Sequence, residues 1–255
     1  MNDSPQLPPH YELVQLYHVD DVMREAARRA RNGAGEGTLV WAVEQGDAHT
    51  TSDKRWYSPP GNLHCALLLR PDYSNARCGQ LAYVAALSVG SALAELLLPM
   101  TGLRYRWPSK LYINDLRAGQ IMLAASDGHS DPYEWLALGV MVNVAEHPPN
   151  PEPEEFVSVH ASGATDVTVA QVLEGFARYF LHWINRWAEN GFGPIAHQWQ
   201  LRADGVGEEM TVRVGEQTHR GTFVEVDEEG RLVLLESGQI EQRISVNAFF
   251  ALDGE

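Results

Sequence analysis

The sequence has little positive charge and almost no lysine. Its 255 residues contain 34 acidic side chains against 19 basic ones, for a formal net charge of −15. Nucleic acid and anionic membranes repel such a polyanion, so we expect neither as a primary partner. Lys54 and Lys110 are the only lysines, and the other basic residues are arginine. Because the compact, titratable lysine ammonium is not equivalent to a guanidinium, these two positions are informative.

Cysteine is equally scarce, and an export signal is missing. Cys65 and Cys78 match no metal or redox spacing, which predicts reduced thiols in a cytoplasmic protein. The polar, proline-rich start of the chain has no apolar core, so we expect no signal peptide. Leu81–Leu98 is the one stretch that resembles a membrane span. Because it contains Glu95 and ends at Pro99, we interpret it as a buried core helix.

The apolar residues are plentiful, at 44% of the chain with seven tryptophans, and this composition excludes a disordered protein. Alternation, continuous apolar runs and capping residues predict an α+β fold. Asp20 or Asp21 is expected to cap the first helix, and Thr168 a long amphipathic one that ends at Gly191. The predicted strands are 11–17, Thr38–Val43, Leu63–Leu69, Leu103–Arg106, Leu111–Ile113, Gln120–Ala125 and Trp135–Val144, with a further helix near Arg77–Leu98.

The pattern changes after Trp199. Four short alternating segments follow, separated by turns that contain glycine. A compact all-β module of this kind is close in size to an SH3-like β-barrel. We therefore predict a first domain at residues 1–203 and a small C-terminal barrel at residues 204–255. The predicted strands of the barrel are Glu209–Val214, Thr218–Val226, Arg231–Leu235 and Gln239–Ile244.

Three segments are richer in polar and aromatic residues than folding alone requires. Gln45–Gly61 is a long polar loop between two predicted buried strands, and a loop of this kind is more often functional than decorative. The second segment is Arg104–Met122, which holds Lys110. The third is Leu138–Val144, a buried strand that ends near a polar amide. We expect the ligand site in the loop Gln45–Gly61.

These segments also carry motifs in a particular order. Gln45 is followed by Trp56 and then by Ser58–Leu63; Arg106–Tyr112 and Gly139–Asn143 come later. Together they resemble the Q…W-[FY]-S-P-x-G-x-x-L, K-W-P-N-D-[LI]-x and G-[AIV]-G-[IV]-N stretches of the biotin/lipoate protein ligase family. The resemblance extends over nearly the whole chain. It implies the mixed sheet of the class II synthetases and biotin ligases.

The resemblance also implies a chemistry. The family joins biotin or a lipoate-like acyl group to ATP, with magnesium, as an acyl-adenylate, and then passes the acyl group to a lysine of a carrier protein. It implies a small carboxylate ligand, a carrier-protein acceptor and a homodimer through strand edges. The expected catalytic residues are Lys110 and Arg117, the latter aligned with a family lysine, which would stabilise developing negative charge. The expected ligand-binding residues are Gln45, His49, Thr50, Thr51, Lys54, Arg55, Trp56, Arg106, Trp107 and Asn143.

The chain departs from the family pattern where the chemistry should lie. Ala48–Asp53 replaces a glycine- and arginine-rich loop that holds the phosphate, and Ser109-Lys110 replaces Asn-Asp. Met141 replaces the second glycine of the G-x-G strand, and Asp21-Val22 a Ser-Thr pair. One alternative is therefore a non-catalytic protein that binds a ligand or a partner on the same scaffold. Another is an acyl transferase that uses pre-activated acyl groups without ATP.

Each candidate residue also has a purely structural interpretation. Lys54, Arg55 and His49 would lie on a solvated loop, and Lys110 would cap a turn or pair with Asp115. The alternative for Trp56 and Trp107 is a place in the core, and for Asn143 a hydrogen bond at a strand end. If the functional interpretation holds, Lys54, Arg55, Arg106, Lys110 and Arg117 form a cationic pocket for an anionic ligand.

Overall fold

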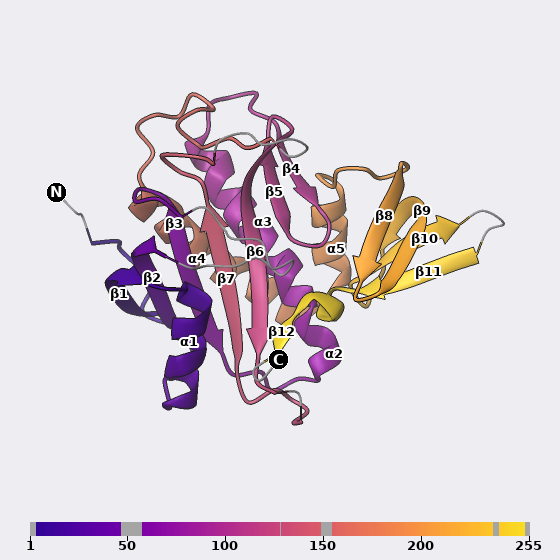
Figure 1. Cartoon of the computed structure of the whole chain (residues 1–255), viewed down its shortest axis with the longest axis horizontal. Helices are drawn as coiled ribbons and strands as arrows, with labels where there is room; N and C mark the ends of the chain where they lie inside the picture. The colour runs from indigo at the N-terminus through magenta and orange to yellow at the C-terminus, as the bar shows by residue number, and fades with distance from the viewer. Residues whose placement is uncertain (1–3, 47–57, 128, 149–154, 237–239, 253–255) are drawn as a thin grey trace.

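A large mixed sheet with helices on both faces forms most of the molecule (Figure 1). The computed structural model describes residues 4–46, 58–127, 129–148, 155–236 and 240–252. The strand order is β1-β2-β3-β7-β6-β5-β4, and β1 runs parallel to β2 while the following pairs are antiparallel. The strands are β1 (Glu12–Val19), β2 (Thr38–Gln45), β3 (Leu63–Leu69), β4 (Leu103–Arg106), β5 (Lys110–Ile113), β6 (Leu116–Ala125) and β7 (Leu136–Val142).

The crossover from β1 to β2 is the helix α1 (Val22–Arg31). Asp21 caps it, as one of the two predicted candidates, because its Oδ1 accepts the backbone N–H groups of Met23 at 2.7 Å and Arg24 at 3.1 Å. Apolar residues at helical spacing then bury one face of α1 on the sheet: Val22, Met23, Ala26, Ala27 and Ala30. In Figure 1, α1 lies in front of the sheet.

The opposite face of the sheet is covered by α3 (Gln80–Leu96) and α4 (Val169–Asn190). With the short α2 (Asn75–Cys78), the stretch Asn75–Leu96 is the one described segment long and apolar enough to cross a membrane. Of its most apolar window, 78% is buried inside the fold, so it is a core helix, as expected. Thr168 caps α4 through a reciprocal pair of hydrogen bonds with Gln171, and Gly191 ends it at a φ of 74°.

The C-terminal part is a four-stranded antiparallel sheet in the order β11-β10-β9-β8, beside the large sheet (Figure 1). Helix α5 (Gly193–Gln200) leads into it, and Tyr83 on α3 joins the two parts by donating its hydroxyl to the carbonyl of Gly230 at 2.9 Å. After this sheet the chain returns, and β12 pairs in parallel with β6. The elements are β8 (Glu209–Val214), β9 (Gln217–Val226), β10 (Arg231–Glu236), β11 (Ile240–Ser245), η1 (Val246–Phe249) and β12 (Ala251–Leu252).

The predicted α+β class, with a helix-packed mixed sheet and a small C-terminal β-module, is confirmed. The central strands β3 and β7 are buried along their whole lengths, because helices cover both of their faces, and this explains their continuous apolar runs. Asn62 fixes the ends of these two strands together. Its Oδ1 accepts the backbone N–H groups of Val144, Ala145 and Glu146 at 2.9, 3.0 and 3.1 Å.

Candidate functional site

A row of six side chains crosses the large sheet on the face covered by α1. Strand register pairs each residue with the next across neighbouring strands. Paired residues of antiparallel strands share a face, and neighbouring strands are ~4.8 Å apart. We call this set the cross-strand row; in strand order from β2 to β4 it consists of Ala42, His64, Met141, Gln120, Lys110 and Arg106.

Cations occupy one end of the cross-strand row. Arg117 on β6 is paired with Tyr112 just beyond a shift in the β5–β6 register, and its guanidinium donates a hydrogen bond to Oε1 of Gln120. The side chain is held in the fold, with Arg117 only 6% exposed and its guanidinium carbon 5.6 Å from the ring centroid of Phe156. Lys110 lies beside Gln120 on the neighbouring strand, half-buried. Two predicted catalytic cations, 7 positions apart in sequence, are thus brought to one end of the row.

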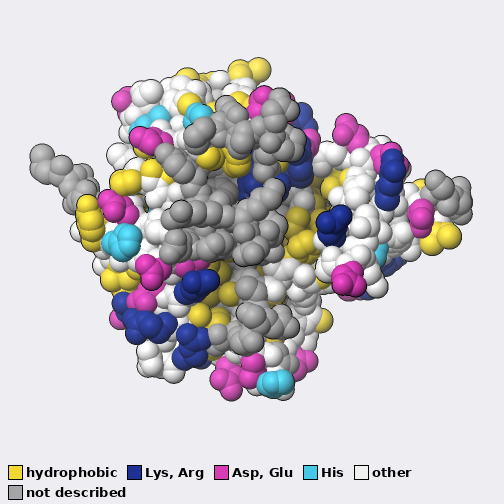
Figure 2. Space-filling model, in the orientation of Figure 1, with side chains coloured by type: hydrophobic (Ala, Val, Ile, Leu, Met, Phe, Trp, Pro, Cys, Tyr) yellow, Lys and Arg dark blue, Asp and Glu magenta, His cyan; other side chains and the backbone are white. Residues whose placement is uncertain are grey.

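Arg106 ends the row on the edge strand β4. Its Nε donates to Oδ2 of Asp204 at 2.8 Å, and its guanidinium carbon lies 4.4 Å from the ring centroid of Tyr112. These contacts offset part of its charge and connect the large sheet to the segment before β8. Figure 2 shows Lys and Arg side chains gathered near β4 and β5, on the part of this face next to the C-terminal sheet.

The other end of the row carries no charge at neutral pH. His64 is completely buried, and this burial lowers its pKa from 6.5 to about 4. Its Nε2 lies 3.5 Å from the carbonyl oxygen of Pro59, a marginal contact. Nδ1 has no hydrogen-bond partner among the described residues. The row therefore runs from a cationic end to a neutral imidazole that retains hydrogen-bonding capacity.

Gln45, a predicted ligand contact, ends β2, and its side chain is hydrogen-bonded within the protein. Its Oε1 accepts the backbone N–H of Val22 at 3.1 Å, and its Nε2 donates to the hydroxyl of Ser58 at 2.9 Å. Together with the cap from Asp21, this contact satisfies the first N–H groups of α1. The positive N-terminal end of α1 is thereby turned toward the protein's own side chains.

Methionine fills the space between α1 and the sheet near this end. Gly139 on β7 is packed so closely beneath Met23 that a Cβ added to it would overlap the Met23 sulfur. Met141, two residues further along β7, is fully buried in the same apolar cluster, together with Met122 on β6. Three flexible thioether side chains thus contribute to the apolar layer between α1 and the sheet.

The comparisons of the chain with known proteins agree with one another. Residues 7–201 match the model of the biotin/lipoate A/B protein ligase family. The chain belongs to this family. It is 30% identical over 223 residues to the biotin–[acetyl-CoA-carboxylase] ligase of Paracoccus denitrificans, covering 86% of this chain and 92% of that protein.

Two solved structures resemble this ligase-family chain along nearly its whole length. A biotin protein ligase-like protein of unknown function from Silicibacter sp. TM1040 matches with a TM-score of 0.82 and 26% identity, covering 97% of this chain and 100% of that one. The biotin protein ligase of Aquifex aeolicus in complex with biotin and ATP matches with a TM-score of 0.78 and 22% identity, covering 92% and 95%. The resemblance inferred from the motifs is confirmed.

Two further predicted ligand contacts, Trp107 and Asn143, are buried and form hydrogen bonds within the fold. Trp107 lies in the core on the face of α3, where its Nε1 donates to the Tyr83 hydroxyl at 2.8 Å and its ring meets Phe249 edge-on at 5.3 Å. Asn143 is fully buried and donates to the carbonyl of Val157 at 3.3 Å, while its Oδ1 has no hydrogen-bond partner among the described residues. The predicted loop contacts lie outside the described residues: His49, Thr50, Thr51, Lys54, Arg55 and Trp56.

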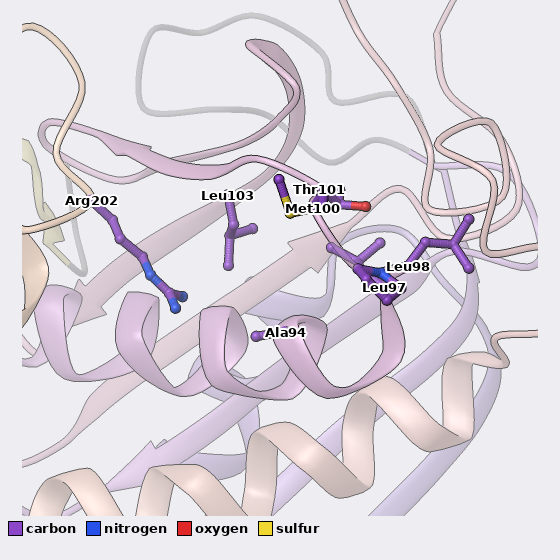
Figure 3. Close-up of a pocket in the computed structure, with 8 residues that line it drawn as sticks. Ala94, Leu97, Leu98, Met100, Thr101, Leu103 and Arg202 are labelled. Atoms are coloured by element: carbon purple, nitrogen blue, oxygen red, sulfur yellow. The ribbon is translucent and has the colours of Figure 1, made fainter.

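The motifs did not single out His64, Gln120 or Met23 as site residues. Alternation along β3 and β6 gives the face on which His64 and Gln120 lie, but only the register between distant strands places both in one row. A separate pocket of about 300 Å³ lies between the end of α3 and β4, with Arg202 at one end and Leu98 at the other (Figure 3). It shares no residue with the cross-strand row.

Proposed function

We propose that this chain is a ligase that binds a small carboxylate on the cross-strand row, activates it with ATP and transfers the acyl group to a lysine of a carrier protein. The observation that carries the proposal is the convergence of Lys110 and Arg117 at one end of the row, beside Gln120. A buried guanidinium in a fixed position is well suited to a carboxylate, because its planar donors match the two carboxylate oxygens. Family membership supports the same chemistry.

The reaction has two steps. An oxygen of the bound carboxylate forms a bond to the α-phosphorus of ATP as pyrophosphate leaves, which gives an acyl-adenylate. The amine of the acceptor lysine then attacks the acyl carbonyl, and AMP leaves. Arg117 and Lys110 would hold the carboxylate in place and stabilise the negative charge that builds up near it. Magnesium would accompany ATP, and within the described ranges no three His, Cys, Asp or Glu side chains gather to hold a metal.

A second function is favoured by the contacts within the site. The polar atoms of Asp21 and Gln45 bond to the protein's own backbone and to Ser58, and Met23 occupies the space over Gly139. A site with these contacts suits a protein that binds a carboxylate without turning it over. This alternative keeps the cationic end of the row and removes the adenylation step.

The two functions are separated by measuring binding and pyrophosphate release on the same protein. Calorimetry with biotin, lipoate, octanoate and ATP identifies the ligands, and an assay with the carboxylate that binds most tightly follows turnover. We expect ATP-dependent pyrophosphate release that falls by about tenfold or more in Lys110→Ala and Arg117→Ala, since a hydrogen bond to a charged group contributes about 1.5–3 kcal/mol.

The control is Arg178→Ala, which removes an exposed guanidinium paired with Glu95 on the helices of the opposite face. Its rate should match the wild type. Tight carboxylate binding with no pyrophosphate release for any ligand would overturn the ligase and support the binding protein. Failure of every carboxylate to bind would overturn both.

A further inference from the structure

We propose that Met23 and Met141 make the site selective for carboxylates with a narrow, unbranched aliphatic chain and exclude those that end in a polar fused ring. The inference rests on the proposed function, because it takes the cationic end of the cross-strand row as the place of the carboxylate. It concerns the other end of the ligand, which neither the cations nor the ATP chemistry determine.

The path of the ligand follows from strand register. A carboxylate held by Lys110 and Arg117 must extend its remaining atoms away from the edge strand, over Gln120 and toward β7 and β3. The distance from the strand of Lys110 to the strand of His64 is three strand spacings, or ~14 Å. The first side chain beyond Gln120 on this path is Met141, and the last is His64.

The width of this path is set by methionine. Gly139 lies on the same face as the row, one same-face pair away from Met141, and the sulfur of Met23 packs so closely on it that an added Cβ would overlap the sulfur. Met141 is fully buried in the same apolar cluster, and Ala66 and Met122 belong to it on the strands either side of Gly139. Because methionine is unbranched and changes rotamer readily, a thin chain can lie between these side chains after small shifts. A rigid bicyclic ring needs a hollow that remains open.

The polarity of the path points the same way. A fused ureido ring brings N–H and C=O groups that must be hydrogen-bonded once they are buried. At this end of the described structure, Asp21 and Gln45 already bond to α1 and Ser58. Two buried side-chain atoms near this part of the path have no hydrogen-bond partner among the described residues: the Nδ1 of His64 and the Oδ1 of Asn143, two residues beyond Met141. Two side-chain atoms cannot satisfy all three polar groups of a ureido ring, its two N–H groups and its carbonyl, whereas an alkyl chain requires no hydrogen bond.

The test is isothermal titration calorimetry with octanoate and biotin, on the wild type, Met23→Ala, Met141→Gly and the double variant. We expect the wild type to bind octanoate at least about tenfold more tightly than biotin, a difference of about 1.4 kcal/mol. The double variant, in which both side chains are shortened, should reduce that ratio by about tenfold. Met100→Ala is the control, because this methionine is 99% exposed and lines the separate pocket between α3 and β4; its ratio should equal that of the wild type.

The outcomes distinguish this inference from the function on which it rests. Equal wild-type affinity for biotin and octanoate, or an unchanged ratio in the double variant, overturns the selectivity alone, provided Arg117→Ala still weakens both ligands. Failure of both carboxylates to bind the wild type overturns the proposed function and the selectivity with it. Thermal unfolding verifies that each variant folds, and Met141→Ala replaces Met141→Gly if the glycine variant does not.

Discussion

Acidification should destabilise this protein through a single buried histidine, His64. The side chain is completely buried, and desolvation lowers its pKa from 6.5 to about 4. In the unfolded chain the imidazole takes up a proton as the pH falls through 6.5, whereas in the folded protein it stays neutral until about pH 4. Between these values the unfolded state binds more protons, so the free energy of unfolding decreases as the pH falls. The contribution of the neutral, buried His64 to the free energy of unfolding is fully present above pH 6.5 and is lost as the pH falls toward 4.

The size of the effect follows from the two pKa values. Between about pH 7.5 and about pH 5, the difference in proton binding lowers the free energy of unfolding by about 2 kcal/mol. Urea denaturation at these two pH values measures it. In His64→Gln, which cannot titrate, the loss over the same interval should be smaller by that amount. The carboxylates and their ion pairs are common to both proteins, so their contribution cancels in the comparison.

His129→Gln is the matched control, because the side chain of His129 is 87% exposed. It should lose as much stability on acidification as the wild type does. If His64→Gln and the wild type lose equal amounts, His64 is already protonated in the fold at mildly acidic pH. The neutral end of the cross-strand row would then be wrongly assigned.

Two further stability predictions test the local structure on the two faces of the large sheet. Asp21→Ala removes the cap that accepts the N–H groups of Met23 and Arg24, and should cost about 1 kcal/mol in urea denaturation, while Asp20→Ala should cost little. Gly90→Ala on α3 should lower the free energy of unfolding by about 1–3 kcal/mol, because the new Cβ would overlap the hydroxyl of Tyr105, which is buried on β4. A loss below about 0.5 kcal/mol in urea denaturation would show that the Tyr105 ring can move aside.

Local sequence patterns were sufficient for most of the fold. The strand Leu63–Leu69 has the predicted bounds, and Thr168 and Gly191 end α4 as expected, because caps and continuous apolar runs are local signals. The sequence patterns did not predict α5, η1 or β12. Helix α5 is short and begins with Gly193 and Pro194, a pair typical of turns. Strand β12 has two residues, and its partner β6 lies far away in sequence.

Sequence motifs single out some residues of the candidate site and miss others. Lys110 and Arg117 were found by alignment to a motif, and the structure brings them together. His64 was read as a residue of the sheet, which it is, but its place in the row depends on pairing with β2 and β7. Trp107 also lies in a motif, and the structure places its indole in the core, where it donates a hydrogen bond to Tyr83, in agreement with the structural interpretation of this residue. Register between distant strands is a property of the whole fold, and no single segment encodes it.

The central claim is that a carboxylate lies at the cationic end of the row. It is tested most directly by removing the charge of the ligand carboxylate and the charge of Arg117, separately and together. The affinities of the best-binding carboxylate and of its methyl ester are measured on the wild type and on Arg117→Ala, which completes a double-mutant cycle. We predict that esterification weakens binding to the wild type by about tenfold or more. The loss should be much smaller in Arg117→Ala, corresponding to a coupling of about 1.5–3 kcal/mol. An equal loss in both proteins would show that the carboxylate does not lie beside Arg117 and would contradict the account.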